Sequence, residues 1–120
     1  MTDANFVEPS GLSIMNVSTA EDLVKLVLAA CEYSAIVQAS RTVNLRIQLK
    51  KKYLNIRNTN PTIAHDPDNF WVSKTGFISA AGGCIVMMKD TPLGRRIVVI
   101  LGSQNTRTRI PEAETILALK

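Results

Sequence analysis

Several residue types that carry chemistry are scarce in this 120-residue chain. It has one histidine, His65, and two cysteines, Cys31 and Cys84, without a Cys-x-x-Cys motif. Structural metal sites draw their ligands from closely spaced histidines, cysteines and acidic residues, so a metal site is not expected, and no motif indicates another cofactor. Both cysteines are expected to be small buried hydrophobic residues rather than partners in a disulfide.

Long apolar runs are also missing, since none reaches the roughly 18 residues that a membrane span needs. Residues 1–10, "MTDANFVEPS", contain neither a basic start nor an apolar segment. No secretory signal is therefore visible, and the chain as written is expected in the cytoplasm. Apolar residues make up 46% of the chain and charged residues 20%, which is typical of one folded domain, here expected to span residues 1–120.

Aromatic residues are few, at 5%, although the formal net charge is +4. A nucleic-acid interface combines clustered basic residues with exposed aromatic residues on which bases stack. The only basic run, Lys50 to Lys52, is expected to be a solvated edge or turn. Binding to nucleic acid is therefore not expected from the basic set, which comprises Arg46, Lys50, Lys51, Lys52, Arg57, Arg95, Arg96, Arg107 and Arg109.

Three helices are predicted, two towards the start of the chain and one at its end. Ser18 and Glu21 have the spacing of a capping box, which predicts a long helix beginning there. Apolar residues then follow with helical spacing, so one face should be buried; they are Leu23, Leu26, Val27, Ala30 and Cys31. Residues 34–40 are expected to form a separate short helix. Pro111 is expected to open a last helix with acidic residues in its first turn.

The middle of the chain is typical of antiparallel strands. Residues 43–49 alternate apolar and polar side chains, which favours a half-exposed strand, with "YLNIRN" as its hairpin partner. Three further strands are predicted at "FWVSKTG", "CIVMMKD" and "RRIVVILG". The last two are apolar at odd and even positions, so both should be central strands covered on both faces. The fold class expected is α+β, an antiparallel sheet of three to five strands with a long N-terminal helix and a C-terminal helix.

The tripeptide Lys74-Thr75-Gly76 ends one predicted strand. At an exposed sheet edge an extended peptide can add itself as a further strand. A threonine hydroxyl can donate to a carboxylate, a lysine ammonium supplies positive potential, and a glycine leaves room for a close approach. The tripeptide is therefore a candidate binding site for a peptide carboxylate.

The surrounding sequence resembles the D-alanyl-D-alanine carboxypeptidase and endopeptidase family of low-molecular-mass penicillin-binding proteins. The resemblance rests on "WVSKTGFISAAGGCIVMM", on "NFVEPSGLSIMNVSTAEDL" and on "RNTNPTI", and covers almost the whole chain. It implies a partial penicillin-binding or β-lactamase-like fold and a serine-type peptidase activity on peptidoglycan outside the cytoplasm. It also implies that Lys74, Thr75, Gly76 and Phe77 bind a stem peptide or β-lactam, with the backbone N–H near Phe77 as an oxyanion donor.

Two motifs of that family are not found in their places. Its nucleophilic serine is followed by lysine at the third position, and no serine of this chain has that neighbour; the serines are Ser10, Ser13, Ser18, Ser34, Ser40, Ser73, Ser79 and Ser103. Its Ser-x-Asn motif should precede "NFVEPSGL", whereas the one match, Ser103-Gln104-Asn105, follows the last strand and is interpreted as coincidence. The chain is thus expected to correspond to the C-terminal half of the enzyme, with Met1 an internal methionine.

Other nucleophile arrangements are weaker. Ser73 and Lys74 are neighbours on a strand and should point to opposite faces, so they should not form a dyad. His65 lies near Asp66 and Asp68, but no serine is associated with them by sequence. No catalytic residue is therefore assigned.

Two functions remain open from the sequence. The chain is either part of a D-Ala-D-Ala peptidase that keeps the carboxylate-binding strand and is not a hydrolase by itself, or a repurposed non-enzymatic protein, such as an inhibitor or adaptor. In the second case an exposed sheet edge would pair with another protein or with a second copy as a homodimer.

Overall fold

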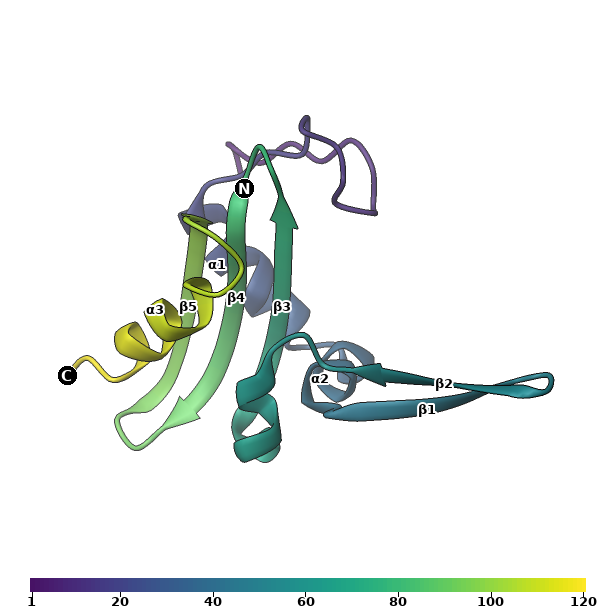
Figure 1. Ribbon diagram of the computed structural model, residues 1–120. Coiled ribbons are helices and arrows are strands. Elements are labelled where there is room, and N and C mark those ends of the chain that lie inside the picture. The colour runs from purple at the N-terminus through teal and green to yellow at the C-terminus, as the bar shows by residue number, and fades with distance from the viewer.

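The computed structural model describes residues 1–120, built around a three-stranded antiparallel sheet with helices on both faces and a separate two-stranded hairpin at one side (Figure 1). The sheet has the order β3-β4-β5, in which β3 spans Phe70–Ile78, β4 spans Gly82–Thr91 and β5 spans Gly94–Ser103. Short connections join consecutive strands, so all neighbours are antiparallel, as predicted. The α+β class is confirmed, although the five strands form two sheets instead of one.

Helix α1 covers Ala20–Ala30, and its start differs from the predicted capping box. Thr19, not Ser18, is the N-cap: its hydroxyl accepts from the backbone N–H of Asp22 at 3.1 Å. Both residues carry hydroxyls, and spacing alone did not separate them. The predicted apolar face is only partly covered, because Val27 is buried while Leu26 remains 41% exposed.

Helix α2 covers Ser34–Arg41 and is separate from α1, as predicted. The two helix axes are bent by 105° at the short break between them. Neither helix, nor any other in this chain, is by itself long and apolar enough to span a membrane.

Strands β1, Asn44–Leu49, and β2, Lys52–Arg57, form the predicted hairpin with Lys50 in its turn. Lys50 has a φ of 48°, in the left-handed region, which closes the tight reversal. The Lys50–Lys52 run therefore lies at a solvent-exposed turn, as the sequence indicated. In Figure 1 this hairpin extends away from the rest of the molecule.

Two hydrophobic clusters lie on opposite faces of the three-stranded sheet. Successive residues of β4 point to opposite sides, with Met87 in one cluster and Met88 in the other. One cluster packs against α3, Arg109–Leu117, through Ala113 and Leu117. The other packs against α1 through Val27. The two helices therefore cover opposite faces, which the sequence had left open (Figure 1).

Two further predictions need correction. Strand β5 contacts α1 and α3, so both of its faces are covered, but it lies at the sheet edge and not in the centre. The last helix begins at Arg109, two residues before Pro111, because a proline in the first turn lacks only an N–H that has no helical partner there. Cys31 and Cys84 are free, as expected, but each is only partly buried.

The N-terminal segment forms a closed loop ahead of α1. Backbone hydrogen bonds between Asn5 and Val17 pair its ends. The Glu8 carboxylate lies inside the loop and accepts from the backbone N–H groups of Ser10 at 2.6 Å and Ser13 at 3.0 Å, and from the Asn16 side chain at 2.5 Å. One carboxylate thus holds most of the loop together.

Candidate carboxylate-binding site

The outer edge of β3 has no neighbouring strand, and helix α2 covers only its first part. Ser40 Oγ accepts from the backbone N–H of Ser73 at 3.0 Å, and Arg41 Nε donates to the carbonyl oxygen of Phe70. Beyond Ser73 the edge is open. Strand alternation places the N–H groups of Thr75 and Phe77 on the same edge as that of Ser73, where an extended ligand could pair with them.

Thr75 lies at the start of this open edge and is 6% exposed. Its hydroxyl oxygen is 2.6 Å from the hydroxyl oxygen of Thr59, so one of the two donates to the other. When Thr59 is the donor, the hydroxyl hydrogen of Thr75 is free to donate to a ligand oxygen. The buried position fixes this hydroxyl at the edge.

Lys74 is exposed, and its Nζ donates to the carbonyl oxygen of Thr75, next to it in the strand. The ammonium therefore lies along the strand edge instead of extending into solvent. Ammonium and hydroxyl come from adjacent residues and together provide a positive charge and a donor of the kind that a carboxylate requires.

The space around Gly76 is large enough for a side chain. A Cβ added there would be 3.9 Å from Cys84 Cβ, an ordinary contact, and its φ is not positive. The packing of this chain therefore does not require glycine at position 76. The sequence predicts another reason for a glycine at position 76, namely that a ligand approaches the backbone there, and this stays a prediction.

Arg109 joins the site from α3, and the sequence reasoning did not assign it there. Its Nη1 donates to the carbonyl oxygen of Gly76 at 2.7 Å, and the side chain is buried. No sequence signal indicated this role, because the helix was predicted to begin at Pro111 and the partner lies 33 positions earlier in the chain. Phe77, next along the strand, is 51% exposed at the end of the open edge.

The loop Asn58-Thr59-Asn60 positions Thr59 against the strand. The Asn58 side chain donates to the carbonyl oxygens of Ser40 and Thr42, at 3.1 and 2.9 Å. Asn60 is 1% exposed and donates to Ser73 Oγ at 3.0 Å. These bonds join the loop both to the end of α2 and to β3. The resemblance had identified this loop, but not its contacts.

A groove of about 840 Å³ leads to Lys74 and Thr75 from the helical side. Most of its lining is apolar and comes from α1, α2 and the three strands of the sheet, including Leu26, Ile36 and Leu101. These three side chains are each more than 40% exposed. The groove thus combines an apolar wall with a polar end at the candidate site.

The alternative nucleophiles have other partners. Ser73 Oγ accepts from Asn60, while Lys74 Nζ donates to a backbone carbonyl, so these neighbours share no hydrogen bond. Asp66 forms its ion pair with Lys89, at 3.3 Å, and His65 is exposed. Ser103, at the end of β5 on the opposite edge of the sheet, is hydrogen-bonded through Oγ to the hydroxyl of Thr108.

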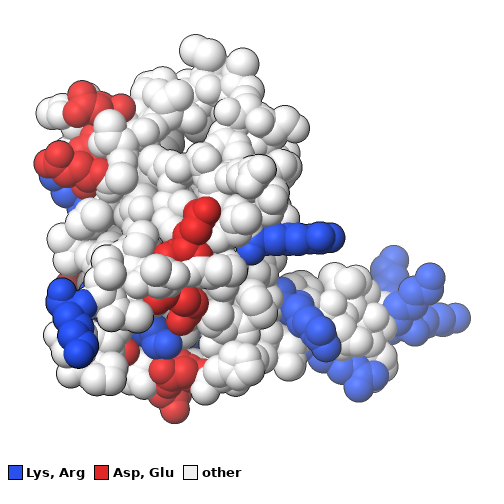
Figure 2. Space-filling view, turned by 60° about the vertical axis from the view of Figure 1, so that its left-hand side comes forward, with Lys and Arg blue, Asp and Glu red and all other residues white.

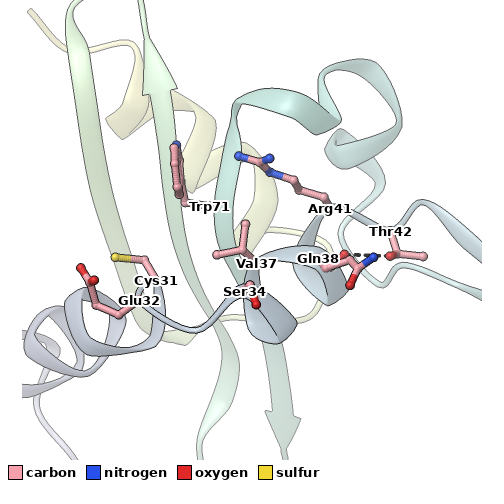
Figure 3. A pocket seen from close by; sticks show the side chains of 8 residues that line it. All are labelled: Cys31, Glu32, Ser34, Val37, Gln38, Arg41, Thr42 and Trp71. Atoms are coloured by element: carbon pink, nitrogen blue, oxygen red, sulfur yellow. Dashed lines mark hydrogen bonds between the residues drawn. The ribbon is translucent and has the colours of Figure 1, made fainter.

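A second pocket, beside α2, contains the Glu32 carboxylate, but no hydrogen bond joins it to Cys31 or Ser34, and the Cys31 thiol donates to the carbonyl oxygen of Leu28. Cys31 and Ser34 line it together with Arg41 and Trp71, but no lysine or histidine does (Figure 3). Arg41 and Arg95 stack on the Trp71 ring, at 5.0 and 3.9 Å from its centre. Asp90 accepts from both Arg95 and the Trp71 indole, and these bonds, that of Arg95 first, lower the pKa of its carboxyl. This cluster joins α2, β3, β4 and β5.

The family model of D-alanyl-D-alanine carboxypeptidases matches residues 1–105. The chain belongs to this family. It is 40% identical over 115 residues to the D-alanyl-D-alanine endopeptidase of Pseudomonas aeruginosa, covering 94% of this chain and 37% of that protein. It is 46% identical over 89 residues to the Escherichia coli D-alanyl-D-alanine endopeptidase, covering 72% of this chain and 29% of that protein.

Solved structures confirm the family fold. The chain matches the D-alanyl-D-alanine carboxypeptidase of Mycobacterium tuberculosis with a TM-score of 0.77 at 19% identity, over 99% of this chain and 48% of that one. It matches penicillin-binding protein D2 of Listeria monocytogenes, in a cefotaxime-bound form, with a TM-score of 0.75 at 22% identity, over 95% of this chain and 46% of that one. The chain therefore spans about a third of these curated relatives and under half of these structures.

Proposed function

We propose that this member of the D-alanyl-D-alanine carboxypeptidase family binds the terminal carboxylate of a peptidoglycan stem peptide, or of a β-lactam, at Lys74, Thr75 and Gly76. The observation that carries the proposal is the buried Thr75 hydroxyl at an open strand edge, held by Thr59 and next to the Lys74 ammonium. The peptide would add to the edge as a strand, and its carboxylate would accept from Thr75.

The chain by itself would bind without cleaving. Acyl transfer needs an activated nucleophile with a base beside it, in addition to oxyanion donors. No lysine Nζ of this chain donates to a serine hydroxyl, since Lys25 and Lys89 pair with acidic residues and Lys74 with a carbonyl. The Phe77 backbone N–H would donate to the oxygen of the ligand carbonyl that a nucleophile located outside these residues attacks.

The groove next to the site is where further residues of such an enzyme would pack. Its apolar lining from α1 and α2 would be buried by a segment that also brings a nucleophile towards Lys74. The length difference from the relatives supports this, because the matched regions make up only 29% and 37% of those proteins. Activity would then require that segment.

A fluorescent penicillin separates binding from turnover. The chain alone is expected to show no covalent labelling after denaturation, because it has no activated serine. NMR titration with a D-Ala-D-Ala peptide is expected to shift the amide signals of Thr75, Gly76 and Phe77 and to leave those of Thr91–Gly94, at the β4–β5 turn, unchanged. Covalent labelling would contradict the missing nucleophile, and unchanged Thr75 signals would contradict the binding site.

A second candidate function is a non-enzymatic interaction protein, such as an inhibitor or adaptor. The observation that favours it is that β3 and β5 are both edge strands without a partner along at least part of their length. Open edges pair readily with other chains, and two copies could pair as a homodimer. Light scattering tests the homodimer: a strict monomer at all concentrations would contradict it.

A further inference from the structure

The β1–β2 hairpin is a separate, basic part of the molecule that takes no part in the carboxylate site. Its two strands form a sheet of their own, and it extends away from the body of the molecule (Figure 1). None of its residues belongs to either hydrophobic cluster. An isolated two-stranded hairpin is only marginally stable in water, so a partner surface would stabilise this one.

One face of the hairpin is apolar. The register pairs Leu45 with Ile56 and Ile47 with Leu54, and directly opposed residues of an antiparallel pair share a face. Leu49 continues the same face towards the turn. Leu45 and Leu49 are 51% and 52% exposed, and Leu54 and Ile56 are each 45% exposed. The structure thus presents a continuous strip of aliphatic side chains to solvent.

The other face and the turn are basic. Arg46 stacks on the ring of Tyr53, with its guanidinium carbon 3.9 Å from the ring centre. Five cations lie within residues 44–57 and no acidic residue occurs between Glu32 and Asp66; the cations are Arg46, Lys50, Lys51, Lys52 and Arg57. Since the whole chain has a net charge of +4, the residues outside the hairpin sum to +4 − 5 = −1. Figure 2 shows this basic group on the projecting hairpin, apart from the acidic residues of the body.

We propose that the β1–β2 hairpin docks on the surface of an anionic lipid bilayer. The aliphatic strip would enter the boundary between headgroups and acyl chains, as the apolar face of an interfacial amphipathic element does. The three lysines at the turn would extend their ammonium groups to the lipid phosphates while their carbon stems stay in the apolar layer.

Charge and composition disfavour the other occupants. A second copy would bring a second hairpin with the same five positive charges against the first. A nucleic acid would contact the basic face but leave the aliphatic strip in water, and Tyr53, the one aromatic residue of the hairpin, already lies under Arg46. An anionic bilayer matches both the charge and the apolar strip.

Vesicle co-sedimentation of the 120-residue chain tests the proposal. The chain should sediment with vesicles of phosphatidylcholine containing phosphatidylglycerol and stay in solution with phosphatidylcholine alone. Replacing Lys50, Lys51 and Lys52 together by glutamine should weaken partitioning about a hundredfold, since each basic residue near an anionic leaflet contributes about fivefold. Arg107→Gln, an exposed charge outside the hairpin, is the matched control and should change it little.

The apolar strip is tested separately. Leu49→Ser, close to the turn, should weaken partitioning several-fold, whereas Leu12→Ser, at a side chain 71% exposed outside the hairpin, should not. A spin-labelled lipid should broaden the hairpin amide signals in NMR spectra and spare those of Thr91–Gly94. That measurement does not depend on any variant keeping its fold.

Several results would overturn the proposal. They are the absence of sedimentation with anionic vesicles, equal sedimentation with neutral ones, and binding that the hairpin variants leave unchanged. Binding to polyglutamate that is as tight as binding to vesicles and insensitive to Leu49→Ser would assign the hairpin to an acidic protein instead. None of these variants alters Lys74 or Thr75, so failure here and failure of the carboxylate site are distinguishable.

Discussion

The hydroxyl oxygens of Thr59 and Thr75 lie 2.6 Å apart, although sixteen positions separate the two residues in the chain. One of these hydroxyls donates to the other, so the two side chains are coupled. Thr75→Val should weaken binding of a D-Ala-D-Ala peptide about tenfold or more, because a hydrogen bond to a charged group contributes roughly 1.5–3 kcal/mol. Isothermal titration calorimetry measures the loss.

Two conservative variants show whether Thr75 contributes through its hydroxyl hydrogen bond or only through the packing of its side chain. Thr75→Ser keeps the hydroxyl and should retain most of the affinity, whereas Thr59→Val leaves Thr75 without its partner and should weaken binding by less than Thr75→Val does. Equal affinities for Thr75→Ser and Thr75→Val would show that the hydroxyl does not bind the ligand.

Gly76 and Gly83 should respond in opposite ways to alanine. At Gly76 the new methyl group has room, and alanine in a strand is about 0.5–1 kcal/mol more favourable than glycine, so Gly76→Ala should not lower the free energy of unfolding. At Gly83 a Cβ would lie 2.3 Å from the carbonyl oxygen of Asn105, a backbone atom, so Gly83→Ala should cost about 1–3 kcal/mol or more. Urea unfolding measures both.

The same Gly76→Ala variant should lose affinity for the peptide while its stability is unchanged. That combination would show that a ligand, and not the fold, requires glycine at this position. An unchanged affinity would mean that the ligand does not approach the Gly76 backbone closely.

Asn60 should be one of the most sensitive polar residues of the chain. Its amide donates to Ser73 Oγ and to Met87 Sδ, and its oxygen accepts twice from Thr62. Asn60→Ala should lower the free energy of unfolding by about 2–3 kcal/mol, because it leaves buried partners unsatisfied. Asn69→Ala, at an exposed residue with a single bond to Asp66, should change it by less than about 0.5 kcal/mol.

The N-terminal loop should loosen in acid. Hydrogen bonds from the Ser10 hydroxyl first, and then from the Ser13 backbone, lower the pKa of Glu8 from 4.5 to about 2. The folded loop thus favours the ionised carboxylate, so its contribution is complete above pH 4.5 and is lost as the pH falls towards 2. The protection factors of the Ser10 and Ser13 amides against hydrogen exchange should fall over this range.

Glu8→Gln is the control for that experiment. The amide cannot ionise, so exchange at Ser10 and Ser13 should already be fast at neutral pH and should show no extra step below pH 4.5. A step that persists in this variant would assign the transition to another group, such as Asp22, whose pKa is also lowered, chiefly by the backbone N–H of Asp3.

Local signals predicted most of the elements, because turns and periodicity depend on neighbouring residues. The hairpin around Lys50, the three strands from Phe70 onwards and the break between the first two helices all followed from them. What the sequence could not predict depends on residues far apart. The contact of Arg109 with Gly76 and the placement of α1 and α3 on opposite faces are both of this kind.

The candidate site also contains residues that local sequence predicts and residues that it does not. Lys74, Thr75, Gly76 and Phe77 are contiguous, so a motif was enough to predict them, and their role in binding stays a prediction. Thr59 and Asn60 reach the strand only because the loop crosses the end of α2, and their contacts were not predicted. The capping error at Ser18 has a simpler cause, since Thr19 beside it carries an equivalent hydroxyl.

The contact between Ser40 and Ser73 also limits the size of what can dock on β3. Only Lys74 to Ile78 remain available, a span of about 16 Å at roughly 3.3 Å per residue. A short oligopeptide fits this length, whereas a full-length strand from another protein would collide with the C-terminal turn of α2. Helix α2 therefore limits the length of an extended ligand that can pair with the edge of β3.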